Sequence, residues 1–333
     1  MESAHDYQFT YGFVEARIYL APSDGLLAPK GSCGPNWAVF MLHGRRHPQH
    51  DGINTANHEG RLHASVETEV RCLALFLSRH TEFVASPATY CVVTALSHTG
   101  LVRDHNEDSL VIGQWTLCAA ETQTPQTLVF PIASPLVVAV ADGLGGHPGG
   151  DVASSLVVRE LARAGPTLDG EQELRNVLTS CNRALYDIAA DEPTFTAMGT
   201  TVAGALFMSD QLLAFNIGDS RVYSHGPDGL RQVSVDDRPP LARGQEHTAI
   251  VTQTLGGGLT YADVEPHLSS FPPSTDVRWL ICSDGLSDLV DNQTLSNLLQ
   301  EPEDSRAAFE LWKAAMEAGG LDNITLALVR IAG

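Results

Sequence analysis

The chain lacks the features of a membrane-bound or exported protein. It contains no run of about 18 or more apolar residues, which a membrane-spanning helix needs. Its first residues, Met-Glu-Ser-Ala-His-Asp, do not form the basic region and apolar run of a secretory signal. We therefore expect a soluble protein in the cytoplasm.

Basic residues are also scarce. The chain of 333 residues has 20 Lys and Arg against 40 Asp and Glu, which gives a formal net charge of −20. Nucleic acids and anionic membranes would repel such a chain, so we expect neither as a partner. With 43% hydrophobic and 18% charged residues, the composition is that of a globular protein with a buried core.

No pair of cysteines has the CxxC spacing of a redox or zinc site. A chain of this length does not need disulfide bonds to fold, since small secreted domains are the ones that depend on them. We expect all six cysteines to be free thiols in a reducing compartment: Cys33, Cys72, Cys91, Cys118, Cys181 and Cys282.

Residues 1–90 differ from the rest and predict an N-terminal extension of unknown role. They hold seven of the thirteen histidines and little sustained periodicity, except for residues 66–77, which predict a short helix. His43, His47 and His50 have metal-ligand spacing only in a helix, which Pro48 disfavours, so a polar loop is expected there. The extension is a small accessory domain, a flexible and partly disordered tail, or translated sequence upstream of the true start.

The most informative stretch is residues 136–151. Five apolar residues predict a buried strand that runs into Asp142, and five glycines follow within eight residues. Glycine has no Cβ, so backbone carbonyls and amides at such a turn can approach a bound ion or oxyanion. An ordinary turn with a chance Asp is the alternative, because glycine-rich turns are common.

The periodicity from residue 91 onward predicts hairpins interrupted by two adjacent helices. Antiparallel sheets flanked by helices are therefore expected, an α+β fold and not a parallel βαβ fold. The expected strands cover residues 91–97, 109–112, 136–140, 199–207, 211–217, 221–224, 230–235, 277–282 and 324–331. The expected helices run from a cap at Asp151 to about residue 164, along one face from Leu174 to Ile188, and over residues 305–318.

Carboxylates recur at the ends of these strands and at one tight turn: Glu107, Asp108, Asp142, Asp219, Asp284 and Asp322. Hard divalent cations such as Mg²⁺ and Mn²⁺ prefer oxygen ligands, and no Cys or His cluster here would suit zinc better. Together these carboxylates predict a two-metal centre. Each one alone would more often be a turn residue.

Six motifs, in order, closely resemble those of the metal-dependent protein phosphatases, the protein phosphatase 2C family in its bacterial form. They are Gly100-Leu101-Val102-Arg103 with Asn106-Glu107-Asp108, residues 140–147, Gly199-Thr200-Thr201, Gly218-Asp219-Ser220-Arg221, Ser283-Asp284-Gly285-Leu286 and Asp322-Asn323-Ile324-Thr325. The resemblance covers roughly residues 92–331. It implies a catalytic domain over residues 91–333 with an α-β-β-α sandwich of two antiparallel sheets flanked by helices.

The resemblance also implies the metal ligands. Asp142 would bridge two Mn²⁺ or Mg²⁺ ions, and the carbonyl of Gly143 and the side chain of Glu107 would complete the shell of one ion. Asp284 and Asp322 would hold the other ion together with Asp142.

Further roles implied by the resemblance concern substrate, water and a third ion. Arg103 would grip the substrate phosphate, for which a planar guanidinium is well suited. Asp108 would hydrogen-bond a metal-bound water. Asp219 would be a ligand of a weaker third metal, shared with Asp284.

The activity so implied is hydrolysis of phosphoserine and phosphothreonine on proteins by direct attack of a hydroxide bound to two metals. The expected partners are phosphoprotein substrates and a bacterial Ser/Thr kinase that the enzyme opposes. Two rival hypotheses are a pseudophosphatase, which would use the same fold as a regulatory binding module, and a different two-metal hydrolase such as a phosphodiesterase. The rivals are less favoured because every expected ligand position carries Asp or Glu, whereas other two-metal sites usually include His.

Two departures from the family pattern affect the general acid and the substrate flap. Leu144 stands where eukaryotic members have His; bacterial members have a His three residues further on, so His147 or a metal-bound water would serve as the acid. A merely structural His147 is the alternative, and His105 is a weaker candidate. Many relatives have a longer variable flap after an Asp-His-Ser type sequence, whereas here residues 235–240 run quickly to residues 250–258. The shortened flap resembles that of phosphatases encoded with type VI secretion systems, whose components are a further candidate partner.

Overall fold

The computed structural model describes residues 6–11, 14–19, 41–44, 90–144, 149–240, 248 and 250–332. The chain divides into two compact units, residues 1–88 and 89–333. The described part of the first unit is an antiparallel sheet of three strands, β1 (Asp6–Tyr11), β2 (Val14–Tyr19) and β3 (Met41–Gly44). The predicted helix over residues 66–77 lies outside the described residues.

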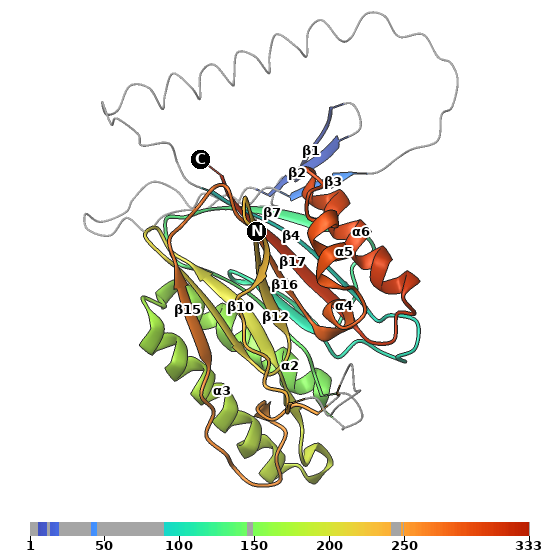
Figure 1. The fold of residues 1–333 in the computed structure, drawn as a ribbon. Helices are drawn as coiled ribbons and strands as arrows, with labels where there is room; N and C mark the ends of the chain where they lie inside the picture. Colours follow the sequence, from blue (N-terminus) through green and yellow to red (C-terminus); the bar gives the residue numbers. More distant parts are fainter. Residues whose placement is uncertain are drawn as a thin grey trace, which may run out of the picture. The chain divides into compact units, whose positions relative to one another are not determined.

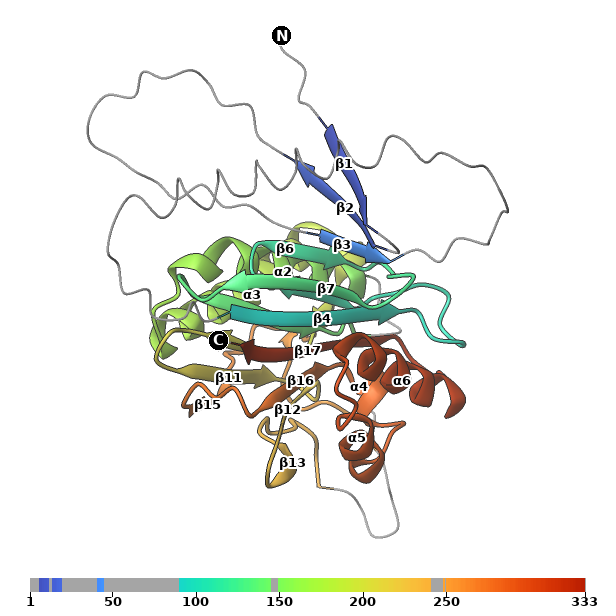
Figure 2. The same ribbon diagram turned by 90° about the horizontal axis from the view of Figure 1, so that it is seen from above.

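Two six-stranded antiparallel sheets form the centre of the second unit (Figure 1). The first sheet has the order β15-β11-β10-β8-β5-β6 and the second has the order β13-β12-β16-β17-β4-β7. The first consists of β5 (Ser109–Ile112), β6 (Trp115–Cys118), β8 (Leu136–Ala141), β10 (Val202–Phe207), β11 (Leu212–Ile217) and β15 (His267–Phe271). The second consists of β4 (Tyr90–His98), β7 (Gln126–Pro131), β12 (Arg221–Gly226), β13 (Gly229–Gln232), β16 (Arg278–Cys282) and β17 (Ile324–Ala332). Figure 2 shows β17, β4 and β7 side by side in the second sheet.

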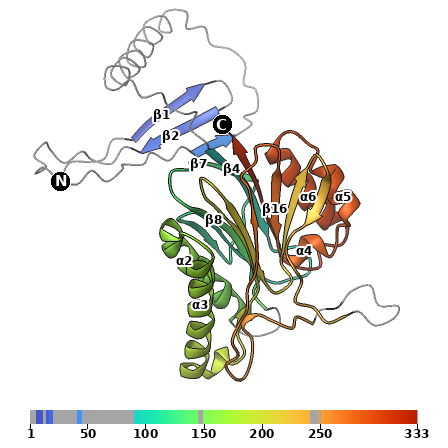
Figure 3. The ribbon, with the colours of Figure 1, turned by 60° about the vertical axis from the view of Figure 1, so that its left-hand side comes forward.

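Helices cover the outer face of each sheet, which completes an α-β-β-α sandwich (Figure 3). The helices α2 (Gly150–Ala164) and α3 (Glu171–Asp191) lie on the first sheet, and α4 (Asp284–Ser287), α5 (Asn292–Leu298) and α6 (Asp304–Glu317) lie on the second. Two short 3-10 helices, η1 (Gly165–Thr167) and η2 (Pro193–Phe195), follow α2 and α3. A two-stranded sheet joins β9 (Gly199–Thr200) to β14 (Leu255–Gly256). The predicted fold class is confirmed.

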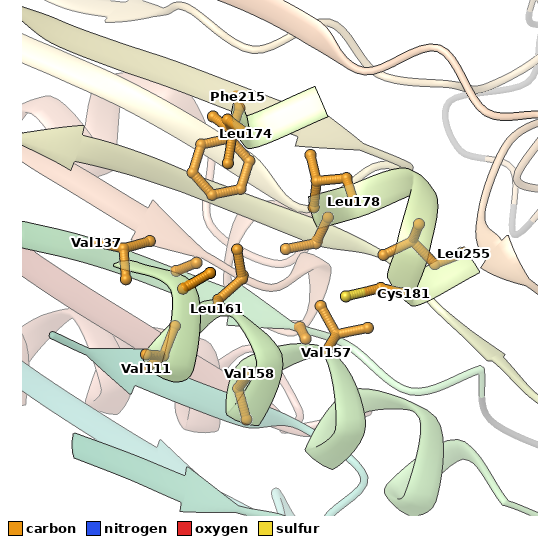
Figure 4. Close-up of a cluster of buried hydrophobic side chains, with 14 of the residues drawn as sticks. Val111, Val137, Val157, Val158, Leu161, Leu174, Leu178, Cys181, Phe215 and Leu255 are labelled. Atoms are coloured by element: carbon orange, nitrogen blue, oxygen red, sulfur yellow. The ribbon is translucent and has the colours of Figure 1, made fainter. Parts of the chain in front are cut away.

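The apolar core has three layers because each sheet buries both of its faces. Strand β8 shows this directly: Val137 and Ala139 face the helices, whereas Val138 and Val140 face the other sheet. Figure 4 shows the helix side, where Val157, Val158 and Leu161 of α2 meet α3 and the sheet. On α3 the contacts come from one stripe of the helix, Leu174, Leu178, Cys181 and Leu185. The third layer packs α5 and α6 on the second sheet.

Nearly all predicted elements are present, with boundaries within a few residues. Helix α2, however, is not capped by Asp151 as predicted. Its N-cap is Gly149, which has φ 91°, and Asp151 lies in the first turn, where its charge still interacts favourably with the helix dipole. The strands β1, β2, β3, β6, β7, β14 and β15 and the short helices α4 and α5 were not predicted. Within the described part of the chain, Cys91, Cys118, Cys181 and Cys282 are free, and no helix is long and apolar enough to cross a membrane.

Candidate metal and phosphate site

The strand register brings the predicted acidic residues to one end of the sandwich. In the second sheet, His98 pairs with Ile324 and Cys282 pairs with Arg221, so the loops before and after these residues meet. In the first sheet, Ser109 pairs with Ala141, which places Asp108 beside Asp142. All six predicted carboxylates therefore come from loops at the same end of the two sheets.

The loop of Arg103 is fixed on the loop of Asp322. Gly100 has φ 86°, and a Cβ at this position would collide with the backbone carbonyls of Gly320 and Asp322. The backbone N–H of Leu101 donates to the carbonyl of Gly320 at 2.7 Å. As a result, Arg103 Nη2 donates to Asp322 Oδ2 at 2.7 Å, and about a third of each side chain stays exposed. Glycine is needed at position 100 because of this close backbone approach.

Asn323 joins three backbone groups of the same region. Its Oδ1 accepts from the backbone N–H of Glu107 at 2.8 Å. Its Nδ2 donates to the carbonyls of Thr99 at 2.9 Å and His105 at 3.0 Å. The side chain is buried, and it links residues more than 200 positions apart in the sequence. Asn323 therefore sets where Glu107 lies relative to Asp322.

Asp108 is held in a buried hydrogen-bond network. Its Oδ2 accepts from Ser283 Oγ at 2.8 Å, and the same hydroxyl accepts from the backbone N–H of Thr325 at 3.0 Å. The other oxygen, Oδ1, is buried and has no hydrogen-bond partner among the described residues. A buried carboxylate oxygen without a partner carries a large desolvation cost, so this atom is suited to a water molecule or a cation.

Asp142 and Gly143 are positioned through their backbone. The carbonyl of Asp142 accepts from the N–H of Thr201 at 2.8 Å and from Thr200 Oγ1 at 2.7 Å. A Cβ on Gly143 would collide with the carbonyl of Gly150 and would lie 2.8 Å from the carbonyl of Glu107. The glycine-rich turn is therefore a place where three backbone segments pack closely together.

Glu107 packs against the start of helix α2. A Cβ on Gly150 would lie 2.7 Å from Glu107 Oε1, so the carboxylate almost touches the first residue of the helix. Ser154 Oγ donates to the carbonyl of Glu107 at 2.6 Å. The ring of His105 reaches the same carboxylate, with Nε2 3.6 Å from Oε1.

The carboxylate of Asp219 is paired with Arg238, which fills the space beside it. Arg238 Nε donates to Asp219 Oδ2 at 2.7 Å, and Nη2 lies 3.3 Å from Asp284 Oδ2. The same guanidinium forms a fork with Asp288, with distances of 3.0 Å and 2.7 Å. Arg221, which lies in the same motif as Asp219, pairs instead with Asp236.

Burial and mutual repulsion raise the pKa values of Asp108, Asp142 and Asp284. Burial raises the pKa of Asp142 well above its usual value, and the charges of Asp108 and Asp284 raise it further. Burial also raises the pKa of Asp108 to about 7, and the nearby Asp322 and Glu107 add to the effect. The pKa of Asp284 rises to about 7 through burial and the charges of Asp219 and Asp288. These carboxyl groups can all ionise at neutral pH only if positive charges lie close to them.

The donor set of Glu107, Asp142, Asp284 and Asp322 fits a hard divalent cation, because oxygen donors with excess negative charge are what Mg²⁺ and Mn²⁺ prefer. Among the described residues, no three Asp, Glu, His or Cys side chains are placed so that they could hold a metal ion as they stand. Two of the carboxylates, Asp322 and Asp284, instead contact arginines. The predicted ligand roles of these residues stay predictions.

Comparison with known proteins identifies the family. A sequence model described as protein phosphatase 2C matches residues 130–323, more than half of the chain. The chain belongs to the protein phosphatase 2C family.

Named bacterial members of the family are similar to this chain. The Ser/Thr protein phosphatase PstP of Mycobacterium tuberculosis is 32% identical over 252 residues, which cover 71% of this chain but only 44% of that protein. The chain therefore matches less than half the length of this relative. The Ser/Thr phosphatase stp of Listeria innocua is 30% identical over 250 residues, which cover 69% of this chain and 92% of that protein.

Solved structures of the same family have the same fold. The catalytic domain of PstP in complex with two manganese ions is 31% identical, has a TM-score of 0.60, and covers 74% of this chain and 100% of that chain. Stp1 of Staphylococcus aureus is 26% identical, has a TM-score of 0.60, and covers 72% of this chain and 95% of that chain. These matches confirm the resemblance that the six motifs indicated.

The predicted general acid of this protein phosphatase 2C, His147, lies outside the described residues. Leu144, just before it, donates its backbone N–H to the carbonyl of Gly199 at 3.0 Å, which ties the turn to strand β9. His105 lies at the edge of the site, where its ring is largely exposed and contacts the carboxylate of Glu107. The identity of the acid therefore stays a prediction.

Sequence reasoning missed three residues of the site: Ser283, Arg238 and Asp288. Ser283 stands directly before Asp284 in one of the motifs, so its place in the motif was a signal. Arg238 and Asp288 carry no such signal, because only the folded chain brings them to Asp219. The role of Asn323 was likewise not predicted, although it follows Asp322 directly.

Proposed function

We propose that this chain is a Mn²⁺- or Mg²⁺-dependent protein phosphatase that hydrolyses phosphoserine and phosphothreonine on proteins. The observation that carries the proposal is that buried and partly buried carboxylates lie close together with Arg103, about a third of whose side chain is exposed, at one end of the sandwich. Its bacterial relatives are named Ser/Thr phosphatases, and one solved relative holds two manganese ions. Both facts support the same activity and cofactor here.

Glu107, Asp142, Asp284 and Asp322, with the carbonyl of Gly143, would hold two ions. When bound, the two ions would lower the pKa of a water molecule so that it can act as the nucleophile, and they would neutralise charge on the phosphoryl oxygens. The chain provides the negative charge that holds them, and the rigid turns described above fix where that charge lies.

Arg103 would bind the phosphate of the substrate. About a third of its side chain is exposed, and its present partner, Asp322, uses only one nitrogen, Nη2. The remaining N–H groups can form a bidentate contact with two phosphate oxygens. Because the loop of residue 100 is docked on the loop of Asp322, the phosphate would be placed beside the carboxylates.

Asp108 would orient water at the site. Ser283 fixes one carboxylate oxygen, which leaves Oδ1 as an acceptor without another partner. An acceptor held in this way can take a proton from water or keep a water molecule in one orientation.

The substrates we propose are proteins phosphorylated by a bacterial Ser/Thr kinase, whose action this enzyme would oppose. The support is chemical: the site faces solvent at Arg103, so a phosphorylated side chain on a protein surface can reach it. We expect hydrolysis to proceed without a covalent enzyme intermediate, since no nucleophilic Cys or Ser is needed at such a centre.

The test is the release of phosphate from a phosphothreonine peptide by the full chain and by Asp142→Asn. The substitution keeps the shape of the side chain and removes its charge, so we expect turnover to fall at least 100-fold and Mn²⁺ affinity to weaken, while the protein stays folded. Asp210→Asn, at an exposed hairpin turn, is the matched control and should keep full activity. Near-normal turnover by Asp142→Asn would overturn the proposal.

The rival hypothesis of a regulatory pseudophosphatase predicts a different result. The unchanged chain would then bind Mn²⁺ and a phosphopeptide but release no phosphate. A hydrolase for cyclic nucleotides or phosphosugars would act on those compounds and leave the phosphopeptide intact.

A further inference from the structure

Arg238 lies among three carboxylates of the site and contacts all of them. Its Nε is 2.7 Å from Asp219 Oδ2, its Nη2 is 3.3 Å from Asp284 Oδ2, and both Nη atoms bond to Asp288. Only 11% of the Arg238 side chain and 3% of the Asp219 side chain are exposed. The arginine is therefore an internal part of the site and not a surface residue that happens to lie nearby.

The guanidinium occupies the space that a metal shared by Asp219 and Asp284 would need. Such an ion must lie about 2.0–2.2 Å from a carboxylate oxygen of each residue. Arg238 already bridges Oδ2 of Asp219 and Oδ2 of Asp284. A cation and the guanidinium cannot both fill the gap between these two oxygens, so binding of an ion there would require Arg238 to leave.

The chain just before Arg238 is fixed by hydrogen bonds of Asp237 and Asp236. Its neighbour Asp237 donates its N–H to the carbonyl of Gly218 at 3.0 Å, and the carboxylate of Asp237 accepts from the N–H of Gly218 at 2.8 Å. The carbonyl of Asp237 accepts from Thr252 at 2.7 Å. The next residue back, Asp236, forms a fork with Arg221. These bonds hold the start of the short flap against the turn that carries Asp219.

The charges of the site also favour the guanidinium over another divalent ion. Seven carboxylates lie here with two guanidinium groups, those of Arg103 and Arg238. The carboxylates are those of Glu107, Asp108, Asp142, Asp219, Asp284, Asp288 and Asp322. When all nine groups are ionised, the net charge is −5. Two divalent ions would leave a single negative charge. A third ion would make the site positive unless it displaced Arg238. Displacement would remove the two bonds that Arg238 makes to Asp288, whose side chain is 23% exposed, and would leave Asp288 only Arg221 Nη2 at 3.4 Å.

We propose that Arg238 replaces a third metal ion in this protein, so that the chain has two metal sites and Asp219 serves as an anchor for Arg238 and not as a metal ligand. The inference rests on the proposed function, because it assumes that the other carboxylates bind two ions. It assigns Asp219 a role that differs from the one implied by the resemblance. It also gives the shortened flap a function, since the flap delivers the arginine.

The experiment counts Mn²⁺ ions per chain by titration calorimetry and by equilibrium dialysis with metal analysis. The full-length protein is compared with Asp219→Asn, Arg238→Ala, the double variant of both, and Arg163→Ala. Arg163 pairs with Glu160 on the exposed face of α2, so its loss controls for the removal of an arginine. Circular dichroism confirms that each variant is folded.

We expect two ions for the unchanged protein, for Asp219→Asn and for Arg163→Ala. Arg238→Ala should bind a third, weaker ion, and the double variant should return to two, which would place the third ion at Asp219. If Arg238→Ala does not fold, the comparison of the unchanged protein with Asp219→Asn decides the matter alone, because the isosteric substitution removes only one charge.

Three ions in the unchanged protein, falling to two in Asp219→Asn, would overturn this inference and leave the proposed function intact. A stoichiometry of two in both Arg238→Ala and the unchanged protein would also overturn it. No bound Mn²⁺ in the unchanged protein would overturn the proposed metal centre together with the inference.

Discussion

Asn323 provides the sharpest test of how the site is held together. Its side chain is 4% exposed and makes three hydrogen bonds to the backbone of residues 99, 105 and 107. Asn323→Ala removes all three and leaves the buried N–H of Glu107 without a partner. At about 1 kcal/mol for each bond, with a higher cost for a buried unpaired donor, the free energy of unfolding should fall by ~2–4 kcal/mol.

Asn323→Asp is the more specific variant because it keeps the size of the side chain. Its Oδ1 can still accept from Glu107, but the second oxygen would face the carbonyls of Thr99 and His105, which are also acceptors. We therefore expect Asn323→Asp to destabilise the protein at least as much as the alanine variant. A simple loss of volume would give the opposite order.

The assay for both variants is urea unfolding of the metal-free protein, followed by circular dichroism. Asn297→Ala is the control, because Asn297 is exposed on α5 and bonds only to the side chain of Gln293, so its loss should change the free energy of unfolding by less than ~0.5 kcal/mol. In a domain of this size the Asn323 variants should unfold at a temperature lower by on the order of 10 °C. Asn323 variants as stable as the control would refute the view that this side chain joins the two loops.

Three further predictions concern the turn, the arginine and pH. Gly143→Ala should lower the free energy of unfolding in urea by ~1–3 kcal/mol and abolish phosphatase activity, because its Cβ would collide with backbone. Gly170→Ala, in extended backbone with room for a methyl group, should change neither the free energy of unfolding nor the activity. Arg103→Ala should mainly raise KM for a phosphothreonine peptide, because it removes a contact to the phosphate already made in the bound substrate; a loss confined to kcat would place the contact in the transition state only. Without metal, the free energy of unfolding should fall as the pH rises from about 4 to 7. The pKa values of Asp108 and Asp284 are about 7 in the folded chain, against an ordinary value of 3.8. The folded state therefore binds more protons than the unfolded state in this range and loses stability as they dissociate. Asp284→Asn should show a smaller fall across this range, and an equal fall would contradict the pKa of Asp284.

The sequence predicted the central elements well because their signals are local. Strand β8 is buried on both faces and reads as a continuous apolar run, and α3 shows its buried stripe directly in the sequence. The strands that were missed have weaker patterns. Strands β6 and β15 are only half-buried, and β7 is an edge strand that ends in Pro131, so partial exposure hides their periodicity.

The candidate site could be predicted only where motifs carry it. Asp142 and Asp284 each end a buried strand, which is a local feature. The pairing of Arg238 with Asp219, Asp284 and Asp288 depends on how the flap folds back on two different loops, and no spacing in the sequence encodes it. Because arginine can pair with any acidic residue within reach of its long side chain, only the structure shows which carboxylates it contacts.

The most direct test of the account is phosphate release by the full chain, titrated with Mn²⁺ and repeated with EDTA, from phosphothreonine and phosphotyrosine peptides of the same sequence. We expect release that rises with Mn²⁺, stops with EDTA and favours phosphothreonine. Release that persists in EDTA, or metal binding without release from either peptide, would contradict the proposal of a metal-dependent Ser/Thr phosphatase.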